Sequence, residues 1–348
     1  MSLQVDIRKQ LGGFCLSAGF TAENGEPLAL LGASGCGKSV TLRCVAGILK
    51  PDEGHIELDG QVLFDSAAHI DLPPQKRHVG YLFQQYALFP NMTVSQNIAV
   101  AVPDKARRSA VTAELLRRFQ LEEAAALQPR QISGGQQQRA ALARILASEP
   151  RAILLDEPFA ALDSYLKYQL ELELQDTLRA FPGPTLWVTH DRGEAYRNCR
   201  RVCVMDRGVS EPVMAMEELF RRPGTVSAAR LSGCKNYTAA VPDGERVVLP
   251  QWGLTLECGG IVPGDVTQVG IRSHHVHPAA AGSANPIPCT VAKVIEDVFG
   301  MIVLLRPHGW REGAPLLRME LPKEEWAALP DRERLTVTVA PENILLLK

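Results

Sequence analysis

The chain has 348 residues, 46% of them hydrophobic, which suits two domains with cores of ordinary size. Its 37 basic and 39 acidic residues leave a net charge of −2, so composition gives no indication of a nucleic-acid partner. No run approaches the roughly eighteen consecutive apolar residues of a membrane span, and Met1–Asp6 lacks the basic and apolar regions of a secretory signal. The eight cysteines form no C-x-x-C pair, which favours a reducing compartment over a disulfide framework or a metal site.

The first informative elements are a short buried strand, Leu28–Leu31, and a helix with Val40, Val45, Ile48 and Leu49 on one face. The loop between them, residues 32–39, fits the pattern G-x-x-x-x-G-K-[ST]. Glycines in such a loop let backbone N–H groups turn toward phosphate oxygens, and the helix adds its positive N-terminal end. A glycine-rich turn with only a structural role is the alternative. The residues predicted to hold the nucleotide here are Gly32, Ser34, Gly35, Cys36, Gly37, Lys38, Ser39 and Val40.

Within this loop, Lys38 is expected to reach the β- and γ-phosphates and the Ser39 hydroxyl to ligate Mg²⁺. Cys36 is either a small loop residue or a site of redox control, since an adduct there would block ATP. An aromatic residue near the N-terminus, Phe14, is the best-placed candidate to stack on adenine, but it equally suits the core of an early strand. Further on, the strand Val79–Leu82 leads into Gln84.

A second loop-to-helix junction lies at Ile132–Gln136. Ser133 followed three residues later by Gln136 is a capping box, and apolar residues then recur at helical spacing until Glu149-Pro150. Ser133, Gly134 and Gly135 therefore form a helix N-terminus open to an anion, with an ordinary N-cap as the alternative. The Ala113–Leu127 region before it is rich in Ala, Leu and Arg and is expected to be part of a helical insert.

Two apolar runs that follow end in polar side chains. Ala152–Pro158 is typical of a buried strand of a parallel sheet and ends in Asp156 and Glu157. The chemistry of an α/β sheet lies at the carboxyl ends of its strands, so Asp156 is expected to face Mg²⁺ and Glu157 to polarise the attacking water. Thr185–Thr189 is another strand, and His190 follows it.

Together these segments resemble ATP-binding cassette (ABC) ATPases, in that family's order and spacing, over roughly residues 1–225. Residues 132–136 resemble the signature sequence, Ala161–Asp163 the D-loop, His190 the switch histidine and Gln84 the Q-loop glutamine. Ile132 stands where leucine is usual in the signature, and we expect no loss of activity from this departure. By role, the resemblance implies Lys38, Gln84, Glu157 and His190 as catalytic residues, Ser39, Gln84 and Asp156 as Mg²⁺ ligands, and Phe14, Gln84, Ser133, Gly134, Gly135, Gln136 and Asp163 as nucleotide contacts beside the phosphate loop.

The chain changes character near residue 225, after the expected closing helix Glu217–Pro223 of the cassette. Turn residues become dense, and the β-rich runs between them suggest a small barrel. These runs are Arg246–Leu249, Val266–Ile271, Thr290–Ile295, Met301–Leu305 and Leu335–Val339. We therefore predict an α/β P-loop NTPase, the ABC cassette, over residues 1–232 with a helical insert at about 88–150, and a smaller all-β, oligonucleotide-binding-like barrel over 233–348. His274, His275 and His277 lie in this tail, where strand alternation would put the last two on one side; no carboxylate or cysteine stands close to support a metal site.

A cassette followed by such a barrel is similar to the ATPase subunits of bacterial importers. Residues 270–276 resemble a segment common in their tails, and residues 283–291 resemble a degraded opening strand of molybdate-binding barrels, with Cys289 where glycine is usual. The resemblance implies ATP and Mg²⁺ as cofactors, a homodimer, integral-membrane permease subunits and a solute receptor as partners, no nucleic acid, and a peripheral place on the cytoplasmic face of the inner membrane. Molybdate is the implied cargo; sulfate, thiosulfate, ferric iron, sugar or polyamine, and a soluble non-transport or an exporter role, are the alternatives.

Overall fold

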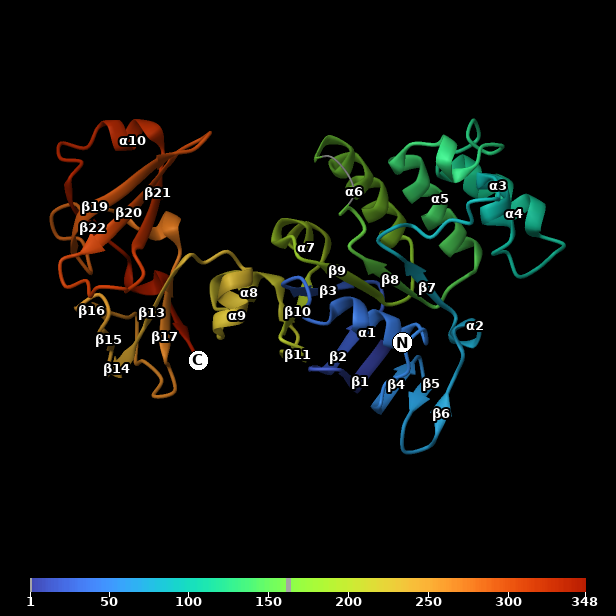
Figure 1. The fold of residues 1–348 in the computed structure, drawn as a ribbon, viewed down its shortest axis with the longest axis horizontal. Helices are drawn as coiled ribbons and strands as arrows, with labels where there is room; N and C mark the ends of the chain where they lie inside the picture. Colours follow the sequence, from blue (N-terminus) through green and yellow to red (C-terminus); the bar gives the residue numbers. More distant parts are fainter. Residues whose placement is uncertain (1, 161–163) are drawn as a thin grey trace. The chain divides into compact units, whose positions relative to one another are not determined.

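The computed structural model describes residues 2–160 and 164–348, which form two compact units, Met1–Met216 and Glu217–Lys348 (Figure 1). Helix α8 (Met216–Arg221) lies at this division, whereas the sequence-based interpretation ends the cassette at residue 232. Helix α9 (Val226–Leu231) packs against strands of the second unit. The expected D-loop, Ala161–Asp163, lies outside the described residues.

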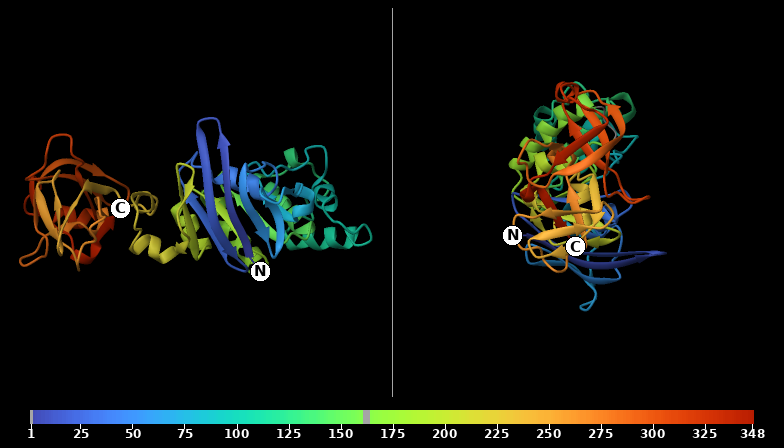
Figure 2. Two further views of the ribbon diagram at one scale, coloured as in Figure 1. Left: turned by 90° about the horizontal axis from the view of Figure 1, so that it is seen from below. Right: turned by 90° about the vertical axis from the view of Figure 1, so that its left-hand side faces the viewer.

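Twelve strands among the described residues of the first unit form one mixed sheet (Figure 2). They are β1 (Ser2–Leu11), β2 (Phe14–Glu23), β3 (Pro27–Gly32), β4 (Glu53–Leu58), β5 (Gln61–Asp65), β6 (Ile70–Asp71), β7 (Val79–Leu82), β8 (Ala152–Asp156), β9 (Thr185–Thr189), β10 (Arg201–Asp206), β11 (Val209–Ser210) and β12 (Met214–Ala215). The order is β6-β5-β4-β1-β2-β11-β10-β3-β9-β8-β7, with β12 beside β10. From β10 to β7 all neighbouring strands are parallel. Strands β1, β2, β4, β5 and β6 pair antiparallel with one another.

The strands predicted from apolar runs are confirmed in the parallel part of this sheet. Every residue of β8 and β9 is buried, as expected for strands covered on both faces. Because β3, β9, β8 and β7 are consecutive parallel neighbours, their carboxyl ends meet at one edge of the sheet. This edge brings together loops that are far apart in the chain.

Helix α1 (Lys38–Val45) packs between the parallel strands and the antiparallel ones, in contact with β2, β3 and β8. The expectation that Ile48 belongs to its apolar face is wrong, because α1 ends at Val45 and Ile48 is 50% exposed. The end is set by Gly47, which has φ +76°, and by the buried Arg77, whose Nη1 donates to the carbonyls of Cys44 and Val45 at 2.8 and 2.9 Å. A Cβ on Gly47 would lie 2.6 Å from the Arg77 Nε. Arg77 therefore satisfies carbonyls that a further turn of helix would have used.

Three helices of the first unit pack on one another, and a fourth lies against the parallel strands. Helices α3, α4 and α5 pack on one another, and α7 contacts β3 and β9. The bounds are α2 (Pro74–Arg77), α3 (Val94–Ala99), α4 (Arg108–Arg118), η1 (Pro129–Gln131), α5 (Gly134–Ala147), α6 (Ser164–Arg179) and α7 (Arg192–Asn198).

Within the Ala113–Leu127 region, which is expected to be part of a helical insert, the residues up to Arg118 lie in α4, which ends there. Gln120 has φ +52°, which breaks the helix. The rest of the segment instead accepts hydrogen bonds from the first turn of α3, since the carbonyls of Ala125 and Leu127 bind the N–H groups of Ser95 and Val94 at 3.0 and 2.8 Å. The otherwise unpaired N–H groups of the first turn of α3 are thereby satisfied by the segment that follows α4.

The second unit is an all-antiparallel, barrel-like β domain, as the spacing of short strands predicts. Three sheets, β13-β17-β23, β14-β15-β16 and β18-β22-β19-β20-β21, enclose a core that includes the fully buried Trp252. The elements are β13 (Asn236–Ala239), β14 (Val241–Asp243), β15 (Arg246–Leu249), β16 (Leu254–Glu257), β17 (Gln268–Ile271), η2 (Ser273–His275), β18 (His277–Pro278), β19 (Ile287–Glu296), β20 (Met301–Pro307), β21 (Leu317–Leu321), α10 (Lys323–Ala327), β22 (Arg334–Thr338), η3 (Pro341–Asn343) and β23 (Ile344–Leu347). All five β-rich runs predicted from the sequence contain a strand.

Strand alternation does not apply to the histidine cluster of this unit, because His274 and His275 lie in a 3₁₀ turn and only His277 is in a strand. Their rings meet edge to face with centroids 4.4 Å apart, and burial lowers the pKa of His275. Within the described part of the chain, no group of three or more His, Cys, Asp or Glu side chains is placed to hold a metal ion.

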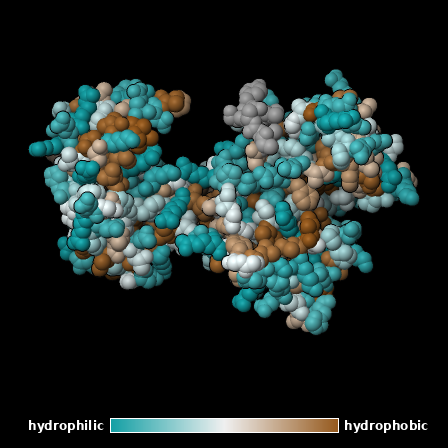
Figure 3. Space-filling view, in the orientation of Figure 1, coloured by the Kyte–Doolittle hydropathy of each residue, from teal (hydrophilic) through white to brown (hydrophobic). Residues whose placement is uncertain are grey.

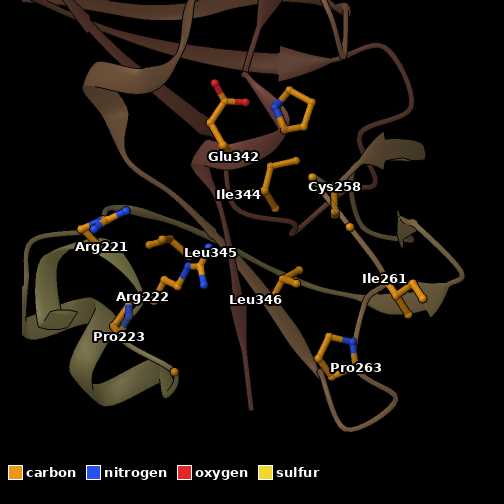
Figure 4. Close-up of a pocket in the computed structure, with 14 residues that line it drawn as sticks. Arg221, Arg222, Pro223, Cys258, Ile261, Pro263, Glu342, Ile344, Leu345 and Leu346 are labelled. Carbon is orange, nitrogen blue, oxygen red and sulfur yellow. The ribbon is translucent and has the colours of Figure 1, made fainter. Parts of the chain in front are cut away.

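Two surface features of the second unit stand out. The turn between β19 and β20 shows as a brown apolar projection in Figure 3, where Val298 is 74% and Phe299 94% exposed. A pocket of about 380 Å³ lies elsewhere on the unit, with Arg221 and Arg222 on one side and Ile344, Leu345 and Leu346 along its floor (Figure 4). Across the described residues, no helix combines the length and apolar character needed to cross a bilayer.

Candidate active site

A pocket of about 350 Å³ lies at the carboxyl edge of the parallel strands. It is lined by Phe14, Ser34, Gly35, Gly37, Lys38, Ser39, Val40, Gln84 and Glu157. These residues come from the glycine-rich loop after β3, the loop after β7 and the end of β8, together with the first residue of β2. The fold therefore brings three of the sequence segments into one cavity.

The glycine-rich loop wraps tightly around the start of α1. Gly35 and Gly37 have φ of +80° and +109°, a region that glycine adopts without strain. A Cβ on Gly37 would lie 3.0 Å from the Phe14 ring and 2.9 Å from Leu16, so the ring packs directly on the loop. Lys38 is 4% exposed, and its Nζ donates to the carbonyls of Gly32 and Ala33 at 2.7 and 2.9 Å. Its ammonium thus lies within the loop, at the positive end of α1.

Gly32 and Cys36 belong to this loop but are not among the described residues that line the pocket. A Cβ on Gly32 would lie 2.5 Å from the Cys36 sulfur and 2.4 Å from the Met205 carbonyl oxygen. The Cys36 side chain is itself buried. The Cys36 sulfur lies where a side chain at position 32 would be, so only glycine fits at that position.

A hydroxyl and a carboxylate meet beside the loop. The Ser39 Oγ donates to Asp156 Oδ1 at 2.8 Å, and the Tyr81 hydroxyl donates to Asp156 Oδ2 at the same distance. Asp156 is 6% exposed, at the end of β8. Tyr81 lies on the neighbouring β7, and no sequence motif indicated its part in this arrangement.

Glu157 follows Asp156 in a strained backbone conformation, with φ +47°. Such conformations cost free energy in non-glycine residues and gather at functional sites. Its N–H donates to the Val188 carbonyl at 3.0 Å, which fixes the turn against β9. Its Oε1 lies 3.2 Å from Nδ1 of His190, and the histidine side chain is 55% exposed. The structure therefore pairs the two side chains at the ends of adjacent strands.

Gln84 is exposed in the turn after β7 and lines the pocket. The next residues are strained too, since Tyr86 and Ala87 have φ of +57° and +46°. Arg144, on α5, donates to both of their carbonyls, at 3.2 and 2.8 Å. Burial lowers the pKa of Arg144. These two hydrogen bonds link α5 to the loop that carries Gln84. A basic residue within a helix is too common in sequences to indicate such a contact.

The capping box at the start of α5 is confirmed. Ser133 Oγ accepts from the Gln136 N–H at 3.3 Å, and Gln136 Oε1 accepts from the Ser133 N–H at 3.0 Å. None of the residues 133–136 is among the described residues that line the pocket, and Ser133 is exposed. One chain therefore does not bring this helix N-terminus to the glycine-rich loop.

A partly buried ionic network supports the loop that carries His190. The Asp191 side chain caps α7 and pairs with Lys167 of α6 at 2.7 Å, and Lys167 also lies 3.1 Å from Glu194. Burial raises the pKa of Glu194, while its hydrogen bond from the Trp187 Nε1 and the charge of Lys167 oppose that rise. No sequence pattern indicated Lys167 and Glu194, because their pairing depends on how α6 packs against α7.

Known proteins match the part of this chain that carries the pocket, and some of them match well beyond it. A family model described as ABC transporter matches residues 16–160. The Fe(3+) ions import ATP-binding protein FbpC 2 of Rhodococcus jostii is 40% identical over 264 residues, which cover 75% of this chain and 75% of that protein. The chain belongs to the ABC transporter ATPase family.

Two further likenesses extend this result. The sulfate/thiosulfate import ATP-binding protein CysA of Bradyrhizobium diazoefficiens is 37% identical over 296 residues, or 81% of this chain and 84% of that protein. A solved dimeric ATP-binding cassette in a post-hydrolysis state, bound to ADP and Pi, superposes with a TM-score of 0.52 and 28% identity over 62% of this chain and 99% of that one. The P-loop NTPase fold of this ABC transporter ATPase is therefore as the sequence predicts.

The residues beside the loop of this ABC transporter ATPase fit a magnesium ion. Mg²⁺ prefers hard oxygen ligands, usually one or two from the protein with the rest from water and phosphate. Ser39 Oγ and Asp156 Oδ1 are such oxygens, already 2.8 Å apart and next to the phosphate loop. The exposed Gln84 borders the same pocket and can add an amide oxygen.

Proposed function

We propose that this ABC transporter ATPase hydrolyses ATP in the 350 Å³ pocket to drive solute uptake through a partner membrane permease. The observation that carries the proposal is the convergence of three groups at one sheet edge. These are the glycine-rich loop with Lys38, the Ser39–Asp156 pair, and the Glu157–His190 pair. Phosphate binding, metal binding and activation of water each need one of them.

In this proposal the loop N–H groups and Lys38 hold the phosphates, and Phe14 offers its ring to the adenine. Ser39, Asp156 and Gln84 would hold Mg²⁺, which would neutralise charge that develops on the transferred phosphoryl group. Glu157 takes a proton from the attacking water, and its strained backbone aims the carboxylate into the pocket. His190 orients that carboxylate and reaches toward the γ-phosphate.

The second half of each site would come from another copy of the chain. Ser133 is exposed at the start of α5 and residues 133–136 lie outside the pocket lining, which supports a role for Ser133, Gly134, Gly135 and Gln136 at a neighbour's nucleotide. A two-fold homodimer then encloses two ATP molecules, each between Lys38 of one chain and Ser133 of the other. Asp163, which the resemblance implies as a nucleotide contact, lies outside the described residues. The dimeric cassette that this chain resembles supports the arrangement by analogy.

Import is proposed because relatives over most of this chain are named as import proteins. The partners would be integral-membrane permease subunits and a solute receptor, with the ATPase on the cytoplasmic face of the membrane. For the cargo we propose an oxyanion such as molybdate, which rests on the resemblance of residues 283–291 to molybdate-binding barrels. In the structure this segment runs into β19, and Cys289 is 1% exposed.

Two measurements test these proposals separately. The ATPase, reconstituted in liposomes with its permease and receptor, should accumulate cargo inside only with ATP and Mg²⁺, and the Glu157→Gln variant is the matched negative control. ATP hydrolysis without any association with a permease would contradict an import role. Competition of labelled molybdate uptake by sulfate and by ferric iron then tests the cargo, and uptake of iron in preference to both oxyanions would overturn the molybdate proposal.

A further inference from the structure

Tyr81 joins two parts of the active site. It lies on β7 with 8% of its surface exposed, directly beside β8 in the parallel sheet. Its hydroxyl donates to Asp156 Oδ2 at 2.8 Å across that pair of strands. Its ring stacks on Phe83, with centroids 4.2 Å apart and an interplanar angle of 28°, and Phe83 immediately precedes Gln84.

The two oxygens of Asp156 are thereby divided between two partners. Oδ1 accepts from the Ser39 hydroxyl and Oδ2 accepts from Tyr81. A carboxylate held at both oxygens cannot rotate freely about its last side-chain bond, and hydrogen bonds to a charged acceptor are among the stronger ones. Without the Tyr81 hydroxyl, the buried Oδ2 would lose its partner and the carboxylate could turn.

The Tyr81 side chain is held at its ring as well as at its hydroxyl. The stack on Phe83 holds the ring in place from the side of the Gln84 loop.

We propose that Tyr81 is a positioning residue that orients the Asp156 carboxylate, so that Oδ1 faces Ser39 and the metal ion that both would hold. This inference rests on the proposed role of Ser39 and Asp156 as Mg²⁺ ligands. Partners that orient a ligand in this way typically change metal affinity by about 10–100-fold when they are removed. Tyr81 is not among the residues that line the pocket, and its hydroxyl acts on the site through Asp156.

The test separates metal binding from nucleotide binding in the full-length protein. Tyr81→Phe removes only the hydroxyl and keeps the ring that stacks on Phe83. ATP binding is measured by calorimetry in EDTA and over a series of MgCl₂ concentrations. We expect unchanged binding in EDTA and a Mg²⁺ half-saturation about tenfold higher than in the wild-type protein. Hydrolysis lost at low Mg²⁺ should return when Mg²⁺ is raised.

Two further variants make the result specific. Tyr237→Phe removes another tyrosine hydroxyl that donates at 2.8 Å, here to the Cys234 carbonyl in the second unit, and should leave both measurements unchanged. Asp156→Asn should remove most of the Mg²⁺-dependent gain in binding. Wild-type Mg²⁺ half-saturation in Tyr81→Phe overturns the inference, and so does an equal loss of binding in EDTA, which a merely structural role would cause. Undiminished Mg²⁺ dependence in Asp156→Asn would instead overturn the proposed metal site, and the inference with it.

Discussion

Two pockets of similar volume are lined by different kinds of residue. One, of about 350 Å³, lies in the first unit, and the other, of about 380 Å³, lies in the second. In the first, polar lining side chains are paired with polar side chains at the ends of buried strands, as Ser39 is with Asp156 and Glu157 with His190. In the second, glycines, prolines and leucines form most of the wall, and the exposed Arg221 and Arg222 make no ion pair with the described residues. Volume alone therefore does not mark a reactive site, whereas converging, mutually oriented polar groups do.

The backbone shows the same difference. The first pocket includes Glu157 with φ +47°, and strain of this kind persists only where the surrounding structure enforces it. The lining of the second pocket takes a positive φ at Gly224, where glycine bears no such cost. Strain is thus concentrated in the unit whose chemistry needs fixed geometry.

The largest expected effect is on turnover. Glu157→Gln keeps the shape and hydrogen bonding of the side chain but removes the base, so ATP hydrolysis should fall about 10²–10⁴-fold while ATP binding survives. The matched change in the second pocket, Glu342→Gln, should leave hydrolysis unchanged. Phosphate-release assays beside equilibrium ATP binding measure both. Equal turnover in the two variants would remove the distinction between the pockets and the assignment of the base.

The second prediction concerns the stability of the second unit. Trp252 is fully buried in its core and its Nε1 donates to the Pro315 carbonyl at 2.8 Å. Trp252→Ala should lower the free energy of unfolding of this unit by about 3–5 kcal/mol, because it leaves a large cavity. ATP binding at the first pocket should persist. Segment-resolved hydrogen exchange in urea, together with ATP binding, measures the two units separately, and a simultaneous loss of both would show that they unfold together.

The third prediction tests whether the active site is shared between chains. Lys38→Ala should weaken ATP binding within one chain, whereas Ser133→Arg should leave binding by the monomer intact and block closure of the dimer. A mixture should form heterodimers that hold one complete site, and these should hydrolyse ATP faster than either variant alone. Cross-linked heterodimers no more active than the single variants would contradict the shared site.

The smallest expected effect is a pH dependence of stability in the first unit, away from the pocket. The hydrogen bond of His55 with Asp65, at 2.9 Å, raises the pKa of His55. Its contribution to stability is therefore full below the ordinary histidine pKa and is lost as pH rises through the higher folded value. The pair is partly exposed, so the effect should stay below about 1 kcal/mol. Unfolding of His55→Gln and wild-type protein should differ at pH 5.5 and converge at pH 9; a constant difference would refute the assignment.

The sequence was sufficient where function depends on neighbours in the chain. The glycine-rich loop, the capping box at Ser133 and the apolar strands that end in Asp156 and His190 are local patterns, and strand order at a parallel sheet edge follows from general rules. The sequence failed at Ile48, where Arg77 binds carbonyls that a longer helix would have paired, and it did not indicate that α4 ends at Arg118, after which the chain pairs with the N-terminus of α3. Local propensity cannot anticipate such competition.

Only the tertiary structure decided which distant side chains meet. Tyr81 reaches Asp156 across 75 positions of sequence because β7 and β8 are parallel neighbours in a particular register. Arg144 reaches the carbonyl of Ala87 across 57 positions because α5 packs beside the Gln84 loop. A tyrosine in an apolar strand and an arginine in a helix are ordinary locally, and they acquire their roles only when packing removes water and fixes a partner within hydrogen-bonding distance.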